Sequence, residues 1–134
     1  MIPWRRAVGF GLLAWLIPFA VALLAFPLRE SARPLFESIM AVTVTGTAVG
    51  LGLAYMRRVP RIGPRKGLLV GVVWFAVCVL VDAPLMLIGG PMRMSLGAYF
   101  ADIGLTYVVI PLVTWGLGVA SVADAGARRD TGAA

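Results

Sequence analysis

Apolar residues fall into four long runs, separated by short segments that carry most of the charge. The runs cover residues 8–26, 35–56, 68–88 and 99–122 and contain 19 to 24 residues each. A helix of that length spans about 28–36 Å, enough to cross a hydrocarbon core about 30 Å thick. No run alternates strictly between apolar and polar residues, and in lipid every backbone polar group needs a partner within its own span. The pattern therefore predicts an all-α membrane protein with four transmembrane helices.

Basic residues are unevenly divided between the two sides of this expected topology. Nine flank the cytoplasmic ends under the positive-inside rule, namely Arg5, Arg6, Arg57, Arg58, Arg61, Arg65, Lys66, Arg128 and Arg129. Only Arg29, Arg33 and Arg93 fall on the other side. We therefore expect both termini to be cytoplasmic. Arginine outnumbers lysine eleven to one, which is typical of a GC-rich prokaryotic genome and predicts a multi-pass protein of a prokaryotic cytoplasmic membrane.

The two halves of the chain resemble each other at an offset of 64 residues. Segment 27–39 aligns with 91–103 without gaps, and identical Pro, Arg, Ser, Phe and Ile residues recur at matched positions. Chance similarity between two apolar hairpins is the alternative, but the Pro-x-Arg-x-Ser match is polar and specific. We interpret 1–56 and 65–122 as tandem parallel helical hairpins within one domain, 1–134. They would be related by a pseudo-twofold axis along the membrane normal.

Composition supports the membrane assignment and narrows the chemistry. The chain is 60% hydrophobic and 13% charged, whereas soluble domains are about 45–50% apolar. It has one cysteine and no His, Asn or Gln, which excludes paired-imidazole haem ligation, His-based metal sites and internal disulfides. The basic residues behind the net charge of +6 flank the apolar runs, so we expect them to contact lipid phosphates and not nucleic acid. We also expect no cofactor.

Asp82 is the most informative polar residue because it lies well inside the third run. A carboxylate there costs about 2.5–3.5 kcal/mol on insertion scales, so it should face the bundle interior and have a partner. The candidate partners are Arg29, Arg93, Tyr99, Thr106 and Tyr107. Two interpretations remain open: a proton- or cation-linked site, or a structural contact that joins the two hairpins.

Asp102 extends this candidate polar site towards the non-cytoplasmic side. Tyr99 and Thr106 lie three residues before it and four after it, on the same helix face. At the same level, Arg29, Arg33, Arg93 and Glu37 form an expected charge belt. The belt is either a set of salt bridges or a clamp for an anion or lipid headgroup.

Two weaker patterns concern helix packing and metal binding. Small and hydroxyl residues form stripes on the second run, namely Thr43, Thr47, Gly46, Gly50 and Ala54, as expected where helices approach closely. Met92 and Met94, with Met86 and Cys78, are weak candidates for a soft-metal site, since thioethers and thiolates select Cu(I). Packing alone also accounts for methionine in membrane helices.

The second half resembles a family of small, uncharacterised prokaryotic four-helix membrane proteins. The resembling elements are Trp74-Phe75, Asp82-x-Pro84, Gly90-Pro91-Met92-x-Met94-Ser95, Asp102-Ile103-Gly104-Leu105-Thr106-Tyr107 and Ile110-Pro111. The resemblance implies the four-helix fold and no particular activity.

Two functions fit these observations. The first is a packing or assembly subunit of a homo-oligomer or of a larger membrane complex. The alternative is a small oligomeric transporter or channel-like protein with a proton- or cation-linked acidic site near the outer face. We expect no enzymatic activity, because His, Asn and Gln are absent from the chain.

Overall fold

The computed structural model describes residues 2–59, 62–88 and 93–132, and within 129–132 it describes the backbone only. All regular secondary structure in this part of the chain is helical, without a β-strand. Four helical segments are long and apolar enough to cross a membrane: Trp4–Leu24, Arg33–Arg58, Pro64–Ile88 and Leu96–Arg128. They contain the four apolar runs to within a few residues, so the prediction of four long apolar helices is confirmed.

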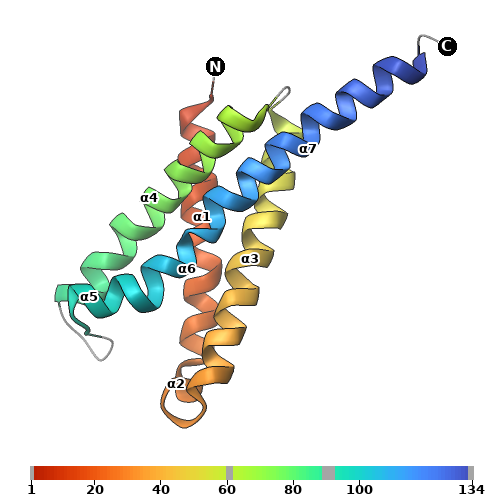
Figure 1. The fold of residues 1–134 in the computed structure, drawn as a ribbon. Coiled ribbons are helices and arrows are strands. Elements are labelled where there is room, and N and C mark those ends of the chain that lie inside the picture. The colour runs from red at the N-terminus through yellow and green to blue at the C-terminus, as the bar shows by residue number, and fades with distance from the viewer. Residues whose placement is uncertain (1, 60–61, 89–92, 133–134) are drawn as a thin grey trace.

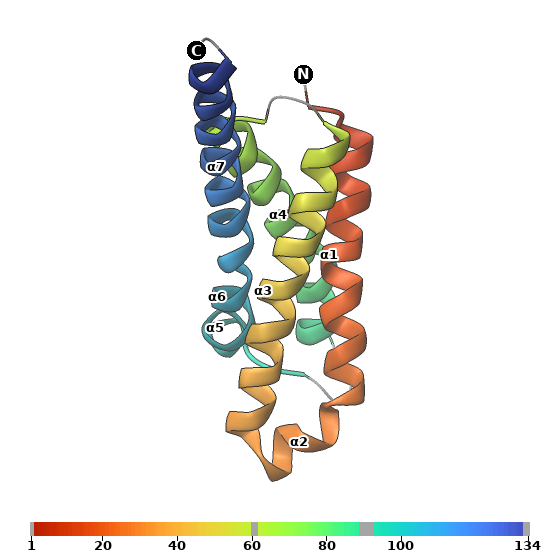
Figure 2. The same ribbon diagram turned by 90° about the vertical axis from the view of Figure 1, so that its right-hand side faces the viewer.

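The elements follow the chain in a simple order. Helices α1 (Trp4–Leu24), α2 (Phe26–Ser31), α3 (Arg33–Arg58) and α4 (Pro64–Ile88) come first, and the fourth apolar segment is divided into α5 (Leu96–Tyr99), the π-helix η1 (Phe100–Gly104), α6 (Leu105–Tyr107) and α7 (Val109–Gly132). Helix α1 packs against α3 and α4, and α7 packs against the same two helices. Figures 1 and 2 show both termini at one end of the bundle, here called the termini end. The short helices α2 and α5 lie towards the opposite end, here called the α2 end.

Proline and serine fix several helix starts. Pro34 and Pro64 occupy the first turns of α3 and α4, where the missing N–H would have no helical partner anyway. Ser95 caps α5, because its side chain accepts a hydrogen bond from the Ala98 amide at 3.3 Å. Residues 89–92, which follow α4 and include the Gly90-Pro91-Met92 part of the family resemblance, lie outside the described residues.

The fourth span is irregular where it passes the middle of the bundle. Residues 100–104 form a π-helical turn, and Val108 bonds back to the Leu105 carbonyl three residues earlier at 3.2 Å. Pro111 has no N–H to offer the Tyr107 carbonyl, which explains a break at this point. Figure 1 shows the resulting change of direction between α5 and α7.

Helices α4 and α7 approach each other very closely because glycines face the contact. A side-chain carbon at Gly67 would collide with the Thr114 carbonyl, and one at Gly71 with the Thr114 hydroxyl and the Pro111 backbone. Thr114 itself is buried and donates its hydroxyl to the Ile110 carbonyl at 3.1 Å. Close backbone contact of this kind is the main way in which membrane helices associate.

An aromatic cluster fills the bundle nearer the termini end. The Phe10 ring stacks on Trp74 with centroids 6.0 Å apart and meets Tyr55 edge-on at 5.4 Å. Trp74 and Tyr55 are almost fully buried. The Arg58 guanidinium lies 5.6 Å from the Phe10 ring centroid, a distance suited to a cation–π contact. The cluster joins α1, α3 and α4 into one core.

Candidate functional site

Asp82 occupies the interior of the bundle, as its position in the third run led us to expect. Only 2% of its surface is exposed. Gly71, Trp74, Cys78 and Met86 share this face of α4 and are also buried, in keeping with the three- and four-residue spacing of one helix face. The face that carries Asp82 is therefore the interior face of α4.

Aromatic side chains from two other segments surround the Asp82 carboxylate. The Trp15 indole N–H donates to Oδ1 at 3.3 Å, and the Tyr107 hydroxyl donates to Oδ2 at 3.3 Å. Tyr99 is fully buried, and its hydroxyl lies within reach of the same carboxylate without making a hydrogen bond of good geometry. Asp82 thus joins α1, α4 and the broken fourth span through neutral donors only.

No basic side chain forms an ion pair with Asp82 in the part of the chain that the structure describes. Of the five partners considered from the sequence, Tyr107 is bonded to Asp82 and Tyr99 lies beside it. Arg29 bonds elsewhere, and Thr106 donates its hydroxyl to the Asp102 carbonyl at 3.2 Å. The buried carboxylate is therefore hydrogen-bonded, and none of the described side chains supplies a countercharge.

A partly open cleft of about 90 Å³ leads to Asp82 from the α2 end. Its walls are mainly apolar and come from all four long helical segments and α2; the lining residues include Phe19, Phe26, Phe36, Met40, Met86 and Ile103. Tyr107 and Asp82 line its inner part, and Arg29, Glu37 and Asp102 line it as well. A cleft of this volume has room for several water molecules or for a small ligand group.

Four charged side chains form a cluster at the cleft, here called the rim cluster: Arg29, Arg33, Glu37 and Asp102. Arg33 bonds Glu37 at 2.8 Å and Asp102 at 3.3 Å, and Arg29 lies 3.6 Å from the same Asp102 oxygen. The two positive charges balance the two negative ones. Since α2 and α3 supply three of these residues and η1 supplies the fourth, the rim cluster ties the two halves of the chain together.

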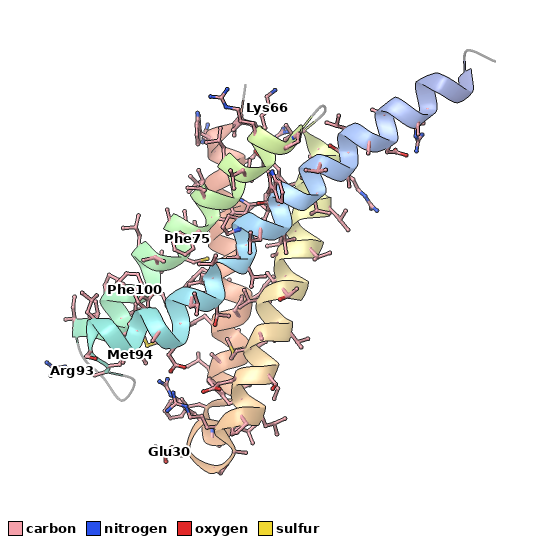
Figure 3. The ribbon with its side chains drawn as sticks, in the orientation of Figure 1. Glu30, Lys66, Phe75, Arg93, Met94 and Phe100 are labelled. Atoms are coloured by element: carbon pink, nitrogen blue, oxygen red, sulfur yellow. The ribbon has the colours of Figure 1, made fainter. Side chains whose placement is uncertain are left out.

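Arg93 does not join this cluster. Figure 3 shows it beside Met94 with its side chain directed away from the bundle, and it is exposed. Arg29, its counterpart in the proposed internal repeat, is instead half-buried against Asp102. Three of the four residues expected in the charge belt therefore meet, together with Asp102.

The predicted packing stripe on α3 divides between two environments. Gly46 and Gly50 face outwards, and nothing lies within 4 Å of a side-chain carbon built at either position. Thr47 and Ala54 are half-buried, and Thr43 donates its hydroxyl to the Ile39 carbonyl at 2.7 Å. The two glycines thus leave a flat strip on the outside of the bundle.

The candidate soft-metal ligands lie only partly within the described residues. Met92 lies outside the described residues; Met94 is half-buried, and its amide donates to the Met86 carbonyl at 3.0 Å. Cys78 is a buried free thiol. Among the described residues there is also no group of three or more Cys, Asp or Glu side chains that could hold a metal ion.

Trp15 is the site residue that reasoning from the sequence missed. It stacks on Phe19 with ring centroids 4.7 Å apart, four residues along the same face of α1. Tryptophan in mid-span, with a donor that needs an acceptor, is the signal that could have indicated it.

Comparison with models of known protein families, with curated proteins and with solved structures finds no match for this chain.

Proposed function

We propose that this protein is a small multi-pass membrane transporter or channel-like protein that takes up a cation or a proton at Asp82. The observation that carries the proposal is the buried Asp82 carboxylate without a basic partner, at the inner end of a cleft. Within a bilayer, an isolated carboxylate is costly unless a proton or a cation neutralises it. Since no side chain in the described residues supplies the countercharge, a mobile cation or a proton can.

The irregular fourth span supports this proposal. Its π-helical turn and the break before Pro111 lie at the level of the cleft, and Asp102, Thr106 and Tyr107 of this segment line it. π-Helical turns are frequent at functional sites. Transporters commonly place broken helices at the substrate site, because the interrupted backbone lines a cavity rather than facing lipid.

We further propose that the cleft opens to the non-cytoplasmic side of a prokaryotic membrane. The rim cluster and the open part of the cleft are at the α2 end, whereas Arg5, Arg6, Arg57 and Arg58 belong to the helix ends at the termini end. The positive-inside rule places the more basic end in the cytoplasm. The tandem duplication, which also stays a prediction, would make the cleft an interface between two related hairpins.

Ion flux in proteoliposomes tests the proposal. Purified protein is reconstituted with a pH-sensitive dye inside the vesicles, and a potassium diffusion potential drives ions across the membrane. We expect wild-type protein to carry protons above the rate of empty vesicles and Asp82→Asn to lose this flux. Asp124→Asn, on an exposed part of α7, is the matched control and should behave as wild type. Equal flux in wild type and Asp82→Asn would contradict the proposal.

A second function, a packing or assembly subunit, has one specific observation in its favour. Gly46 and Gly50 present a flat, open strip on α3 that no other helix of this chain covers in the described structure. Small residues let a further transmembrane helix approach closely. If this is the main role, Gly46→Leu and Gly50→Leu should lower the oligomeric mass in lipid nanodiscs, while Asp82→Asn should leave it unchanged.

A further inference from the structure

We propose that the ligand of the Asp82 cleft is an organic cation with an apolar body, such as a quaternary ammonium compound, rather than a bare metal ion. This inference rests on the proposed function, since it names the class of cation that the same site takes. The juxtaposition that carries it is one uncompensated buried carboxylate within walls of aromatic rings and methionine side chains. The charges, the ligand atoms and the wall residues of the cleft each favour such a cation.

Charge favours a cation over an anion or a neutral ligand. The rim cluster is balanced, because Arg29 and Arg33 together face Glu37 and Asp102 at 2.8–3.6 Å. Asp82 adds a negative charge that no basic side chain offsets in the described part of the chain. The cleft as a whole can therefore accept one positive charge close to Asp82.

The ligand atoms do not suit an inorganic cation. Calcium and magnesium ions are each surrounded by six or more oxygen ligands. Here the groups nearest Asp82 are the Trp15 N–H and the Tyr107 O–H, and both already direct their hydrogens at the carboxylate. The remaining carboxylates, on Glu37 and Asp102, are engaged by arginine. A bare ion at Asp82 would lose most of its hydration shell without replacement.

The walls suit an organic cation instead. Phe19, Phe26 and Phe36 line the cleft, and their ring faces attract quaternary ammonium groups through cation–π contacts. Met40 and Met86 add flexible, polarisable surface that adapts to apolar bodies of different shape. The volume of about 90 Å³ admits a small cationic head. Because the cleft is partly open, a longer apolar part can extend out of it.

The Tyr99 hydroxyl is a further polar group beside Asp82, and it is not engaged by another side chain in the described structure. It is fully buried, lies beside Asp82 and has no hydrogen-bond partner in the described structure. An unpartnered buried hydroxyl costs about 1–3 kcal/mol.

Calorimetry on the full chain in lipid nanodiscs, with empty nanodiscs as the blank, tests this inference. The probes are benzyltrimethylammonium, its uncharged isostere neopentylbenzene, and sodium. We expect the ammonium compound to bind most tightly, and Asp82→Asn to weaken it at least about 30-fold, as the loss of a buried charge partner does. Phe36→Leu keeps the apolar bulk but removes the ring, and should weaken the ammonium compound alone by about two- to thirty-fold. Phe75→Leu, on a half-buried position of α4 that does not line the cleft, is the matched control.

The outcomes separate this inference from the proposed function. Ammonium binding that depends on both Asp82 and Phe36 supports the inference. If the ammonium compound does not bind, or binds equally to Asp82→Asn, the inference is overturned. Asp82-dependent ion flux in proteoliposomes would then leave the proposed function standing. Absence of both binding and flux would overturn both. Unchanged helical content and mass of the variants in nanodiscs establish that they are folded.

Discussion

Replacing Asp82 by asparagine removes a buried charge and keeps the shape of the side chain. The structure gives Asp82 two neutral donors at 3.3 Å and no basic partner in the described residues. Removing a charge at this depth recovers about 2.5–3.5 kcal/mol on insertion scales. The amide of asparagine keeps one oxygen, which can accept from the Trp15 N–H, and its NH2 group can donate to the Tyr107 hydroxyl. Replacing the two charge-assisted hydrogen bonds by these neutral ones costs about 1 kcal/mol each. The net expectation is that Asp82→Asn is as stable as wild type or more stable, by up to about 1.5 kcal/mol.

The alternative, that Asp82 is a structural anchor with an ionic partner, predicts a result of opposite sign. Breaking a buried ion pair costs about 3–5 kcal/mol, because it leaves the other charge unpaired. The free energy of unfolding can be measured by titrating mixed micelles with dodecyl sulfate, followed by far-UV circular dichroism. A loss of 3 kcal/mol or more in Asp82→Asn, at unchanged cooperativity, would refute the reasoning from an uncompensated charge.

Five further substitutions, two of them matched controls, test particular contacts by the same measurement. Gly71→Ala should cost about 1–3 kcal/mol, because its methyl group meets the α7 backbone, whereas Gly46→Ala, in open space, should not destabilise the protein; equal effects would contradict the described α4–α7 contact. Arg33→Met should have only a small effect, because the side chain is 63% exposed and water screens its ion pairs, and Arg93→Met should have no effect. Trp15→Phe keeps an aromatic ring, although a smaller one, and removes the indole donor to the carboxylate, so it should cost about 1.5–3 kcal/mol; a smaller cost, matching that of an exposed position, would argue against the hydrogen bond.

The sequence by itself determined the number and extent of the helices. Four runs of 19 to 24 apolar residues leave the backbone no option in lipid except to satisfy its own hydrogen bonds. It also indicated that Asp82 faces inwards, since a charge at that position is too costly to face lipid. The sequence also indicated that Glu37 and Asp102 can pair with arginines, because these residues lie at matching levels on different spans. Such inferences depend on position along a helix and need no knowledge of how the helices pack.

Tertiary structure alone decided which side chains touch. Helices α1 and α4 are apolar all round, so the sequence does not show which of their faces pack together. The contact between Trp15 and Asp82 could therefore not be predicted. Both Arg29 and Arg93 lie at the level of the acidic residues, so the sequence made both of them candidate ion-pair partners. The irregular fourth span brings Asp102 to Arg29, while Arg93 faces away from the bundle. Likewise, Gly67 and Gly71 form the close helix contact and Gly46 and Gly50 do not, although both pairs have the same spacing. Spacing fixes the face that a residue shares, but the rotation and bending of each helix fix what that face meets.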